Sequence, residues 1–327
     1  MKNSLLTHSI VIVIALLIGA WVGHEWQEKS YAHAEQIFSK GGGGLTNPLL
    51  ECGVETGEVS IGERAAIEDE VSAYVESTLK RGLITHVAVY FRDLNNGPWF
   101  GIDERTQFEP GSLLKLPIAM SFYYWDQRHR GVLESTIDLT DPKSQERFVV
   151  SNNADPSQKR IEPSVYTVRD LIGIMLRDSS NVAADVLAEY EGRERMQKIF
   201  MDLGIEPPVP GGNYTTDVKT YGAFFRVLYN ASYIGEVDSE ELLTTLTQST
   251  FRDGLVRGVP ASVKVAHKYG TRIVGEGGHR QLHDCGIVYS EKTPYVLCIM
   301  TQGESMKKLE STIADISKIV YDGVAVP

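Results

Sequence analysis

Ser112 and Lys115 are the residues of this sequence whose types and spacing best suit covalent chemistry. The pair Pro110-Gly111 precedes them, and the apolar run 113–125 follows, with Lys115 as its one charge. Such a run predicts a buried helix with Ser112 at its N-terminus. Residues three apart share a helix face, and apolar surroundings lower the pKa of a lysine so that it can act as a base. A hydroxyl, a base and a helix N-terminus that can hold an oxyanion are the parts of a serine acyl-transfer site.

The Ser-x-x-Lys spacing alone does not establish catalysis, because both residues are common. Two further copies, Ser77-x-x-Lys80 and Ser305-x-x-Lys308, lie in amphipathic segments that predict solvated helix faces. Ser112 differs from both because a chain breaker precedes it and a buried helix follows it.

The composition is that of a globular protein. Of 327 residues, 42% are hydrophobic and 23% are charged, which suits one large domain or two small ones. The net charge of -11 argues against nucleic-acid binding. No Cys-x-x-Cys or His-Glu-x-x-His spacing occurs, so we expect no metal and no cofactor. Four C-terminal polar residues are interpreted as loop and strand-end residues rather than a ligand set: His267, His279, His283 and Asp284.

Residues 1–26 predict a signal anchor or a signal peptide. Lys2 precedes the apolar run 10–22, and tryptophans flank the far end of that run. This pattern favours an uncleaved anchor, while the small residues around position 33 leave cleavage open. In both cases the rest of the chain is expected outside the cytoplasmic membrane, anchored to it or secreted.

Residues 27–60 predict a flexible linker, because they include four consecutive glycines at 41–44 and no apolar period. Cys52 is interpreted as a free thiol within this linker. The folded domain is therefore expected to comprise residues 61–327.

Hydrophobic periodicity divides the folded domain into helices and strands. An Asn-Asn-Gly turn at 95–97 predicts a hairpin between the first two strands. The polar stretch 141–163 predicts a loop. Helices are expected over 65–79, 113–125, 167–176, 183–187, 193–203, 218–229, 239–246 and 306–321, and strands over 86–91, 99–100, 263–268, 283–289 and 295–301.

Two cysteines lie in the last two predicted strands. If the turn between these strands pairs Ser290 with Thr293, Cys285 and Cys298 face each other across the ladder. We expect two reduced thiols in the core, since a buried cysteine is often simply a small apolar residue.

Three motifs with chemical potential follow one another along the chain: Ser112-x-x-Lys115, Ser179-x-Asn181 and Lys268-x-Gly270. Each lies at the edge of a predicted core element. The rivals lie elsewhere, with Ser151-x-Asn153 in a polar loop, Lys40-x-Gly42 in the linker and Lys80-x-Gly82 at a helix end.

With these motifs the chain resembles the penicillin-recognising serine enzymes, most closely the class A β-lactamase-like family. The resemblance covers about residues 62–325 and includes 167–171 and 180–185 around the second motif. It implies an α/β (α+β) fold of the β-lactamase/transpeptidase type. That fold has about five antiparallel strands, built from both ends of the domain and flanked by helices, plus an all-helical subdomain.

The resemblance also implies roles for the motif residues. Ser112 would attack a carbonyl carbon, and Lys115 would accept the proton of its hydroxyl. Ser179 would pass a proton to the leaving nitrogen, and Lys268 would face the substrate carboxylate. The remaining residues would bind substrate: Asn181 through its amide, Tyr269 beside the carboxylate, Gly270 by letting the strand approach, and Thr271 through a backbone N–H that joins that of Ser112 in an oxyanion hole.

Three departures from the family pattern bear on function. The second motif is Ser-Ser-Asn rather than Ser-Asp-Asn, and Tyr269 stands where a small hydroxyl residue is usual. The Glu-x-x-Leu-Asn loop, whose glutamate activates the deacylating water, is missing. Its candidate replacement, Glu206, is followed by prolines.

The sequence therefore predicts a serine hydrolase or acyltransferase that forms an acyl-enzyme at Ser112 and releases it slowly. The substrate would be a β-lactam or a D-Ala-D-Ala-like stem peptide of peptidoglycan. One alternative is a true β-lactamase with another water-activating group. An alternative of a different class is a catalytically weak domain that binds or senses the cell wall.

Overall fold

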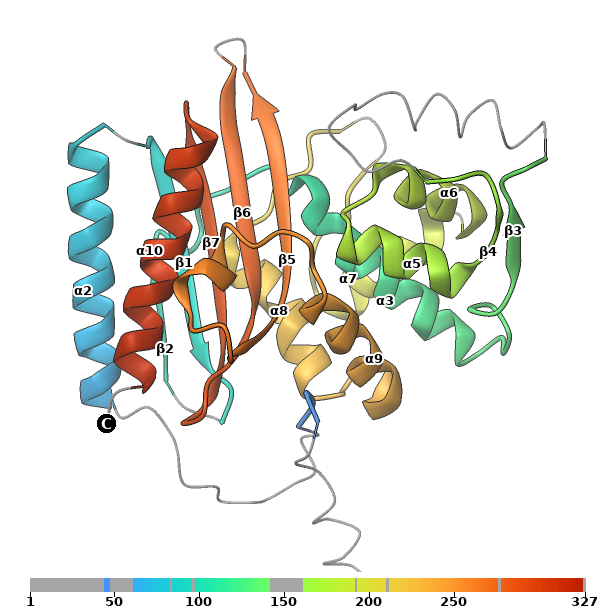
Figure 1. The fold of residues 1–327 in the computed structure, drawn as a ribbon, viewed down its shortest axis with the longest axis horizontal. Helices are drawn as coiled ribbons and strands as arrows, with labels where there is room; N and C mark the ends of the chain where they lie inside the picture. The colour runs from blue at the N-terminus through green and yellow to red at the C-terminus, as the bar shows by residue number, and fades with distance from the viewer. Residues whose placement is uncertain are drawn as a thin grey trace, which may run out of the picture.

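The computed structural model describes residues 44–47, 61–82, 84–95, 98–141, 161–191, 193–209, 212–275 and 278–325. Within these residues the chain forms a five-stranded antiparallel sheet and eight α-helices. Two helices cover one face of the sheet, and the other helices lie on the opposite face and extend from it as a helical half (Figure 1). The predicted α/β (α+β) architecture, with about five antiparallel strands flanked by helices plus an all-helical half, is confirmed.

The sheet joins the two ends of the folded domain. Its strand order is β2-β1-β7-β6-β5, so the first strand pairs with the last. All neighbouring strands are antiparallel. The strands are β1 (His86–Asp93), β2 (Trp99–Ile102), β5 (Lys264–Val274), β6 (His279–Tyr289) and β7 (Pro294–Gly303).

Alternation along the strands separates two apolar cores. On β7, Leu297 and Ile299 pack into the core beneath α2 (Ile61–Lys80) and α10 (Met306–Ala325). Cys298 and Met300 point the opposite way, into the core of the helical half. Because side chains alternate across a strand, one sheet supplies both cores. Strand β5 is the edge of the sheet that borders the helical half, where it contacts α9 and η1.

Strands β6 and β7 pair Cys285 directly with Cys298, with their Cα atoms 3.9 Å apart, and a disulfide joins the two. The register inferred from the turn at Ser290 and Thr293 is confirmed, and Ser290 Oγ donates to Thr293 O at 3.0 Å. The expectation of two reduced thiols is wrong. Residues directly opposite on an antiparallel pair hold their Cβ atoms within about 5 Å, which brings two sulfurs within bonding reach.

The helical half begins with the 3₁₀ turn η1 (Gly111–Leu114), which runs directly into α3. Next come α5 and α6, separated by a short turn, and then α7. Helix α8 packs across β1, β6 and β7, and α9 lies against β5. The bounds are α3 (Lys115–Asp126), α5 (Val168–Arg177), α6 (Asn181–Glu191), α7 (Arg193–Asp202), α8 (Val218–Tyr229) and α9 (Gly235–Thr247).

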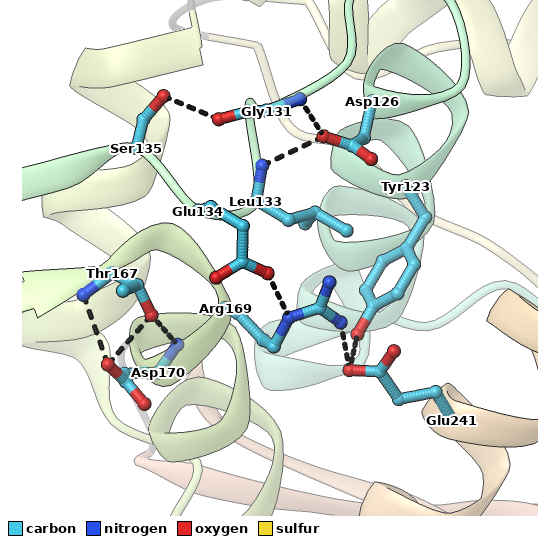
Figure 2. Close-up of polar contacts among 10 residues, drawn as sticks. All are labelled: Tyr123, Asp126, Gly131, Leu133, Glu134, Ser135, Thr167, Arg169, Asp170 and Glu241. Atoms are coloured by element: carbon cyan, nitrogen blue, oxygen red, sulfur yellow. Dashed lines mark hydrogen bonds and ion pairs between the residues drawn. The ribbon is translucent and has the colours of Figure 1, made fainter.

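A polar cluster ties three helices of this half together (Figure 2). Arg169 on α5 forms an ion pair with Glu241 on α9 and donates to Glu134 at 2.9 Å. The hydroxyl of Tyr123 on α3 donates to the same Glu241 carboxylate at 2.7 Å. Burial and this carboxylate raise the pKa of Tyr123, so the phenol stays a proton donor. The cluster fixes α5 relative to α3, and with it the turn that follows α5.

The N-terminus of α5 carries a complete capping box. Thr167 Oγ1 accepts from the backbone N–H of Asp170, and the Asp170 carboxylate accepts from the N–H of Thr167 (Figure 2). Such a cap contributes about 1 kcal/mol to helix stability. The helix therefore begins at a defined residue and ends at Arg177, two positions before Ser179.

Two short strands were missed by the sequence reasoning. Strands β3 (Thr136–Asp138) and β4 (Val165–Thr167) form a separate two-stranded sheet ahead of α5. Three residues are too few to show a periodic pattern. Most of the predicted loop 141–163 lies outside the described residues.

Residues 44–47, part of the predicted linker, pack against the domain. The backbone N–H groups of Leu45 and Thr46 donate to the carboxylate of Glu240 at 2.6–3.0 Å. Tyr289 Oη donates to Leu45 O at 2.9 Å, and the Leu45 side chain is buried. The predicted anchor, the rest of the linker and Cys52 lie outside the described residues. Among the helices that are described, none has the length and apolar character to cross a bilayer.

Candidate active site

Ser112 lies in η1, where the backbone turns sharply beside β5. Gly111 has φ +53°, a left-handed conformation that suits glycine. A Cβ on Gly111 would lie 2.5 Å from Thr271 O, so only glycine allows this approach. A Cβ on Gly270 would likewise lie 2.4 Å from Pro110 O. Two glycines, one on each element, thus let the nucleophile turn and the edge strand lie in direct contact.

Two buried side chains hold the turn from behind. Tyr221 on α8 donates its hydroxyl to Leu113 O at 2.8 Å. His283 Nε2 lies 3.1 Å from Glu109 O. Burial lowers the pKa of His283 to about 4, so the ring is neutral at pH 7 and its Nε2–H donates to that carbonyl. The hydroxyl of Ser112 is therefore carried by a rigid backbone while its side chain stays partly exposed.

Lys115 lies at the start of α3 and is 4% exposed. Its Nζ lies 3.0 Å from Ser112 Oγ and 2.7 Å from Asn181 Oδ1. It also donates to the backbone carbonyl of Ser179 and lies 3.5 Å from Ser179 Oγ. The amine therefore links the nucleophile to the α5–α6 turn.

Burial lowers the pKa of Lys115 to about 8. The carboxylate of Asp185, one turn along α6 from Asn181, opposes this shift. A pKa near 8 leaves a substantial fraction of neutral amine at physiological pH, which is the form that can accept a proton from Ser112.

Ser179 occupies the turn between α5 and α6. Its φ of +55° is uncommon for a residue with a side chain. Strained backbone of this kind is tolerated where the surroundings fix it, and it often occurs at functional sites. Two contacts fix this residue: Lys115 Nζ donates to the Ser179 carbonyl, and Lys268 Nζ lies 2.8 Å from Ser179 Oγ.

Lys268 on β5 has no exposed surface. Its Nζ donates to Ser179 Oγ and, at 3.0 Å, to Tyr269 O. Burial holds the pKa of Lys268 well below its ordinary value, the charge of Lys115 adds to this, and Asp284 opposes it. The Ser179 hydroxyl is thus held between two buried lysine amines.

Tyr269 follows Lys268 at the position where the family pattern has a small hydroxyl residue. The Tyr269 ring centroid lies 4.4 Å from Lys268 Nζ and 4.3 Å from the ring of Phe251, nearly parallel to it at 21°. Phe251 lies between α9 and the 3₁₀ turn η2 (Leu255–Gly258). The motif Lys268–Thr271 lies within β5 rather than at its end, because this strand continues three residues beyond it.

The structure brings the predicted site residues together in one place. Direct contacts join Ser112, Lys115, Ser179, Asn181 and Lys268, and the backbones of Gly270 and Thr271 lie against η1. Their individual roles remain predictions.

Glu206 differs from the other candidates. It is exposed. Burial raises the pKa of Tyr214, and the charge of Glu206 contributes to that shift. Sequence reasoning missed Asp185, although its spacing of four from Asn181 on one helix places both on the same face. Phe251 and Tyr221 carried no local signal, because each reaches the site through tertiary packing.

A sheet built from both chain ends, a serine at the start of a buried helix and two lysines around a second serine are features of serine acyl-transfer enzymes. The model of the β-lactamase enzyme family matches residues 62–324, and the chain belongs to this family. No curated protein sequence matched the chain.

Solved structures share the fold at low sequence identity. PBP-A is 18% identical with a TM-score of 0.65, covering 83% of this chain and 98% of its own. A β-lactamase from Chitinophaga pinensis is 18% identical with a TM-score of 0.65, covering 79% of this chain and 98% of its own. A class A β-lactamase from Mycobacterium abscessus is 22% identical with a TM-score of 0.64, covering 78% and 97%. A PBP-A variant with a similar TM-score of 0.66 was solved as an acyl-enzyme complex with penicillin G.

Proposed function

We propose that the protein forms an acyl-enzyme at Ser112 with β-lactams or with D-Ala-D-Ala-like peptides, and that it releases the acyl group slowly. The observation that carries the proposal is the contact of Lys115 Nζ with Ser112 Oγ at 3.0 Å, by an amine whose pKa is lowered to about 8. The PBP-A complex with penicillin G supports the choice of substrate class.

The proposed reaction uses the groups in sequence. Neutral Lys115 accepts the proton of Ser112 Oγ as that oxygen bonds to the substrate carbonyl carbon. The backbone N–H groups of Ser112 and Thr271 stabilise the oxyanion, and Asn181 binds the substrate amide. Ser179 then donates its proton to the leaving nitrogen as the C–N bond breaks, and it takes up the proton held by Lys115, whose Nζ lies 3.5 Å from Ser179 Oγ. Lys268 polarises the Ser179 hydroxyl during this transfer.

Slow release is proposed because, among the described residues, Ser112 Oγ is hydrogen-bonded to the Lys115 amine and to no carboxylate. Hydrolysis of an acyl-enzyme needs a group that takes a proton from water. The candidate named from the sequence, Glu206, is exposed. The alternative, a true β-lactamase, is favoured by one observation: Asp185 lies near enough to Lys115 to raise its pKa. A solvated aspartate of this kind would be a weak base for water.

We propose further that the protein works outside the cytoplasmic membrane, held by its N-terminal segment or secreted. The Cys285–Cys298 disulfide supports this location, since disulfides persist mainly in oxidising compartments. A cell-wall stem peptide is the natural substrate class in that compartment.

Intact mass after incubation with penicillin G tests the proposal. A stable adduct that Ser112→Ala removes is the expected result, and Ser77→Ala is the matched control because Ser77 belongs to another Ser-x-x-Lys pair. Rapid consumption of the drug without an accumulating adduct would favour the β-lactamase. An unmodified protein with unconsumed drug would favour the cell-wall binding or sensory domain.

A further inference from the structure

Lys268, on the edge strand β5, is completely buried although it lies in the candidate active site. Its side chain has no exposed surface, whereas Ser112, which Lys115 links to the Ser179 turn, is partly exposed. A substrate can therefore reach the nucleophile while the ammonium of Lys268 remains covered.

Two stacked aromatic rings lie beside Lys268, one of them in contact with its ammonium. The ring of Tyr269 lies 4.4 Å from Lys268 Nζ, a cation–π distance. Its other side stacks on Phe251 at 4.3 Å with an interplanar angle of 21°. Tyr269 belongs to the edge strand and Phe251 to the loop after α9, so the stacked pair spans two elements.

From this geometry we propose that Tyr269 and Phe251 act as a specificity cover over Lys268, which removes the usual advantage of substrates that carry a free carboxylate. The inference rests on the proposed acylation of Ser112 and concerns its substrate class. A carboxylate must displace the Tyr269 ring to pair with Lys268, and it then forfeits the cation–π contact and the stack. A neutral group, such as an ester or amide, loses nothing by leaving the cover closed.

The physical reason lies in what a carboxylate needs. A charge-assisted hydrogen bond requires an approach within about 3 Å, and a ring in between prevents it. The ammonium already donates to Ser179 Oγ and Tyr269 O, so two of its three protons are engaged without any substrate. The ring of Tyr269 faces the same ammonium.

An internal competition tests the proposal. The protein is incubated with equal amounts of penicillin G and its methyl ester, and intact mass separates the two adducts, which differ by one methylene. We expect wild type to acylate with both at rates within about threefold. Tyr269→Ser should raise the acid-to-ester ratio about tenfold, the size of one charge-assisted contact.

Two variants separate the ring from the hydroxyl. Tyr269→Phe keeps the ring and should keep the wild-type ratio. Phe251→Leu removes the stacking partner and should move the ratio part of the way toward that of Tyr269→Ser. An unchanged ratio in Tyr269→Ser would overturn the proposal, and so would a Tyr269→Phe variant that behaves like Tyr269→Ser.

Amine labelling tests the cover without relying on acylation. Trace acetic anhydride should leave Lys268 unmodified in wild type and modify it in Tyr269→Ser, as read by peptide mass. Lys264, exposed on the same strand, serves as the internal reference. Equal labelling of Lys268 in both proteins contradicts the cover. If neither penicillin forms an adduct but labelling differs, the proposed acylation fails while the cover stands.

Discussion

Two buried lysines approach the same serine hydroxyl, yet their surroundings differ. Lys115 Nζ lies 3.5 Å from Ser179 Oγ and also contacts the partly exposed Ser112. Lys268 Nζ lies 2.8 Å from the same oxygen and is fully covered. The first amine contacts the hydroxyl proposed to attack the substrate, whereas the second holds and polarises the hydroxyl of Ser179. Burial lowers the pKa of both, so the position of each amine, rather than its burial, assigns its role.

Replacing Lys115 by alanine should produce the largest effect. Without the base, we expect the rate of Ser112 acylation to fall by about a thousandfold, within the range typical of general bases. Stopped-flow or intact-mass kinetics with penicillin G measure this rate. Lys80→Ala is the control because Lys80 is exposed and paired with Glu76 on α2. An acylation rate unchanged in Lys115→Ala would remove Lys115 as the base.

Replacing Lys268 by alanine should have a smaller effect. Ser179 loses one charged donor but keeps the contacts of Lys115, so we expect acylation to slow by about tenfold to a hundredfold. The control is Lys264→Ala on the exposed start of β5. A Lys268→Ala variant as inactive as Lys115→Ala would erase the proposed difference between the two lysines.

The contact between β5 and η1 can be tested through Gly270. In Gly270→Ala the new Cβ would meet Pro110 O at 2.4 Å and push the strand, with Lys268, away from Ser112. Overpacking of this kind costs about 1–3 kcal/mol, which corresponds to a Tm lower by roughly 5 °C, and acylation should slow by several-fold.

Gly62→Ala is the matched control for that substitution. An added Cβ on Gly62 in α2 has nothing within 4 Å, so its Tm should not fall. Equal Tm values for Gly270→Ala and wild type would show that the strand and the nucleophile turn are not tightly apposed.

The smallest effect is expected from Asp185→Asn. The Asp185 carboxylate stabilises the ammonium form of Lys115, so its removal lowers the pKa of Lys115 further below about 8. Acylation needs the neutral amine, and its rate therefore rises with pH through this pKa. We expect the midpoint of that rise to move to lower pH, with less than about threefold change on the plateau. A midpoint that stays in place or moves upward would contradict the assignment.

The elements that carry the site were predictable, while the contacts between them were not. Helix α8 was predicted with its observed bounds, because its apolar residues recur at helical spacing between clear breaks. Strands β5 and β6 extend beyond their predicted limits, since their outer ends carry polar and exposed residues such as Arg272 and Arg280.

The three motifs could be singled out because each lies at the edge of a core element. Two features of the surrounding structure could not be predicted from the sequence. Tyr269 lies on β5, and its stacking partner Phe251 lies in the loop after α9. The stack depends on the packing of α9 against β5, which no local sequence pattern predicts. The disulfide was misjudged because the general burial of cysteines was weighed above the pairing of Cys285 with Cys298.

The pH dependence of Ser112 acylation tests the account most directly. For wild type with penicillin G, we predict a rate that rises with pH around a midpoint near 8 and then levels off, as neutral Lys115 becomes available. In Lys268→Ala the rise should persist at a lower amplitude, and in Lys115→Ala it should vanish. A flat profile in wild type, or a rise that survives in Lys115→Ala and disappears in Lys268→Ala, would contradict the account.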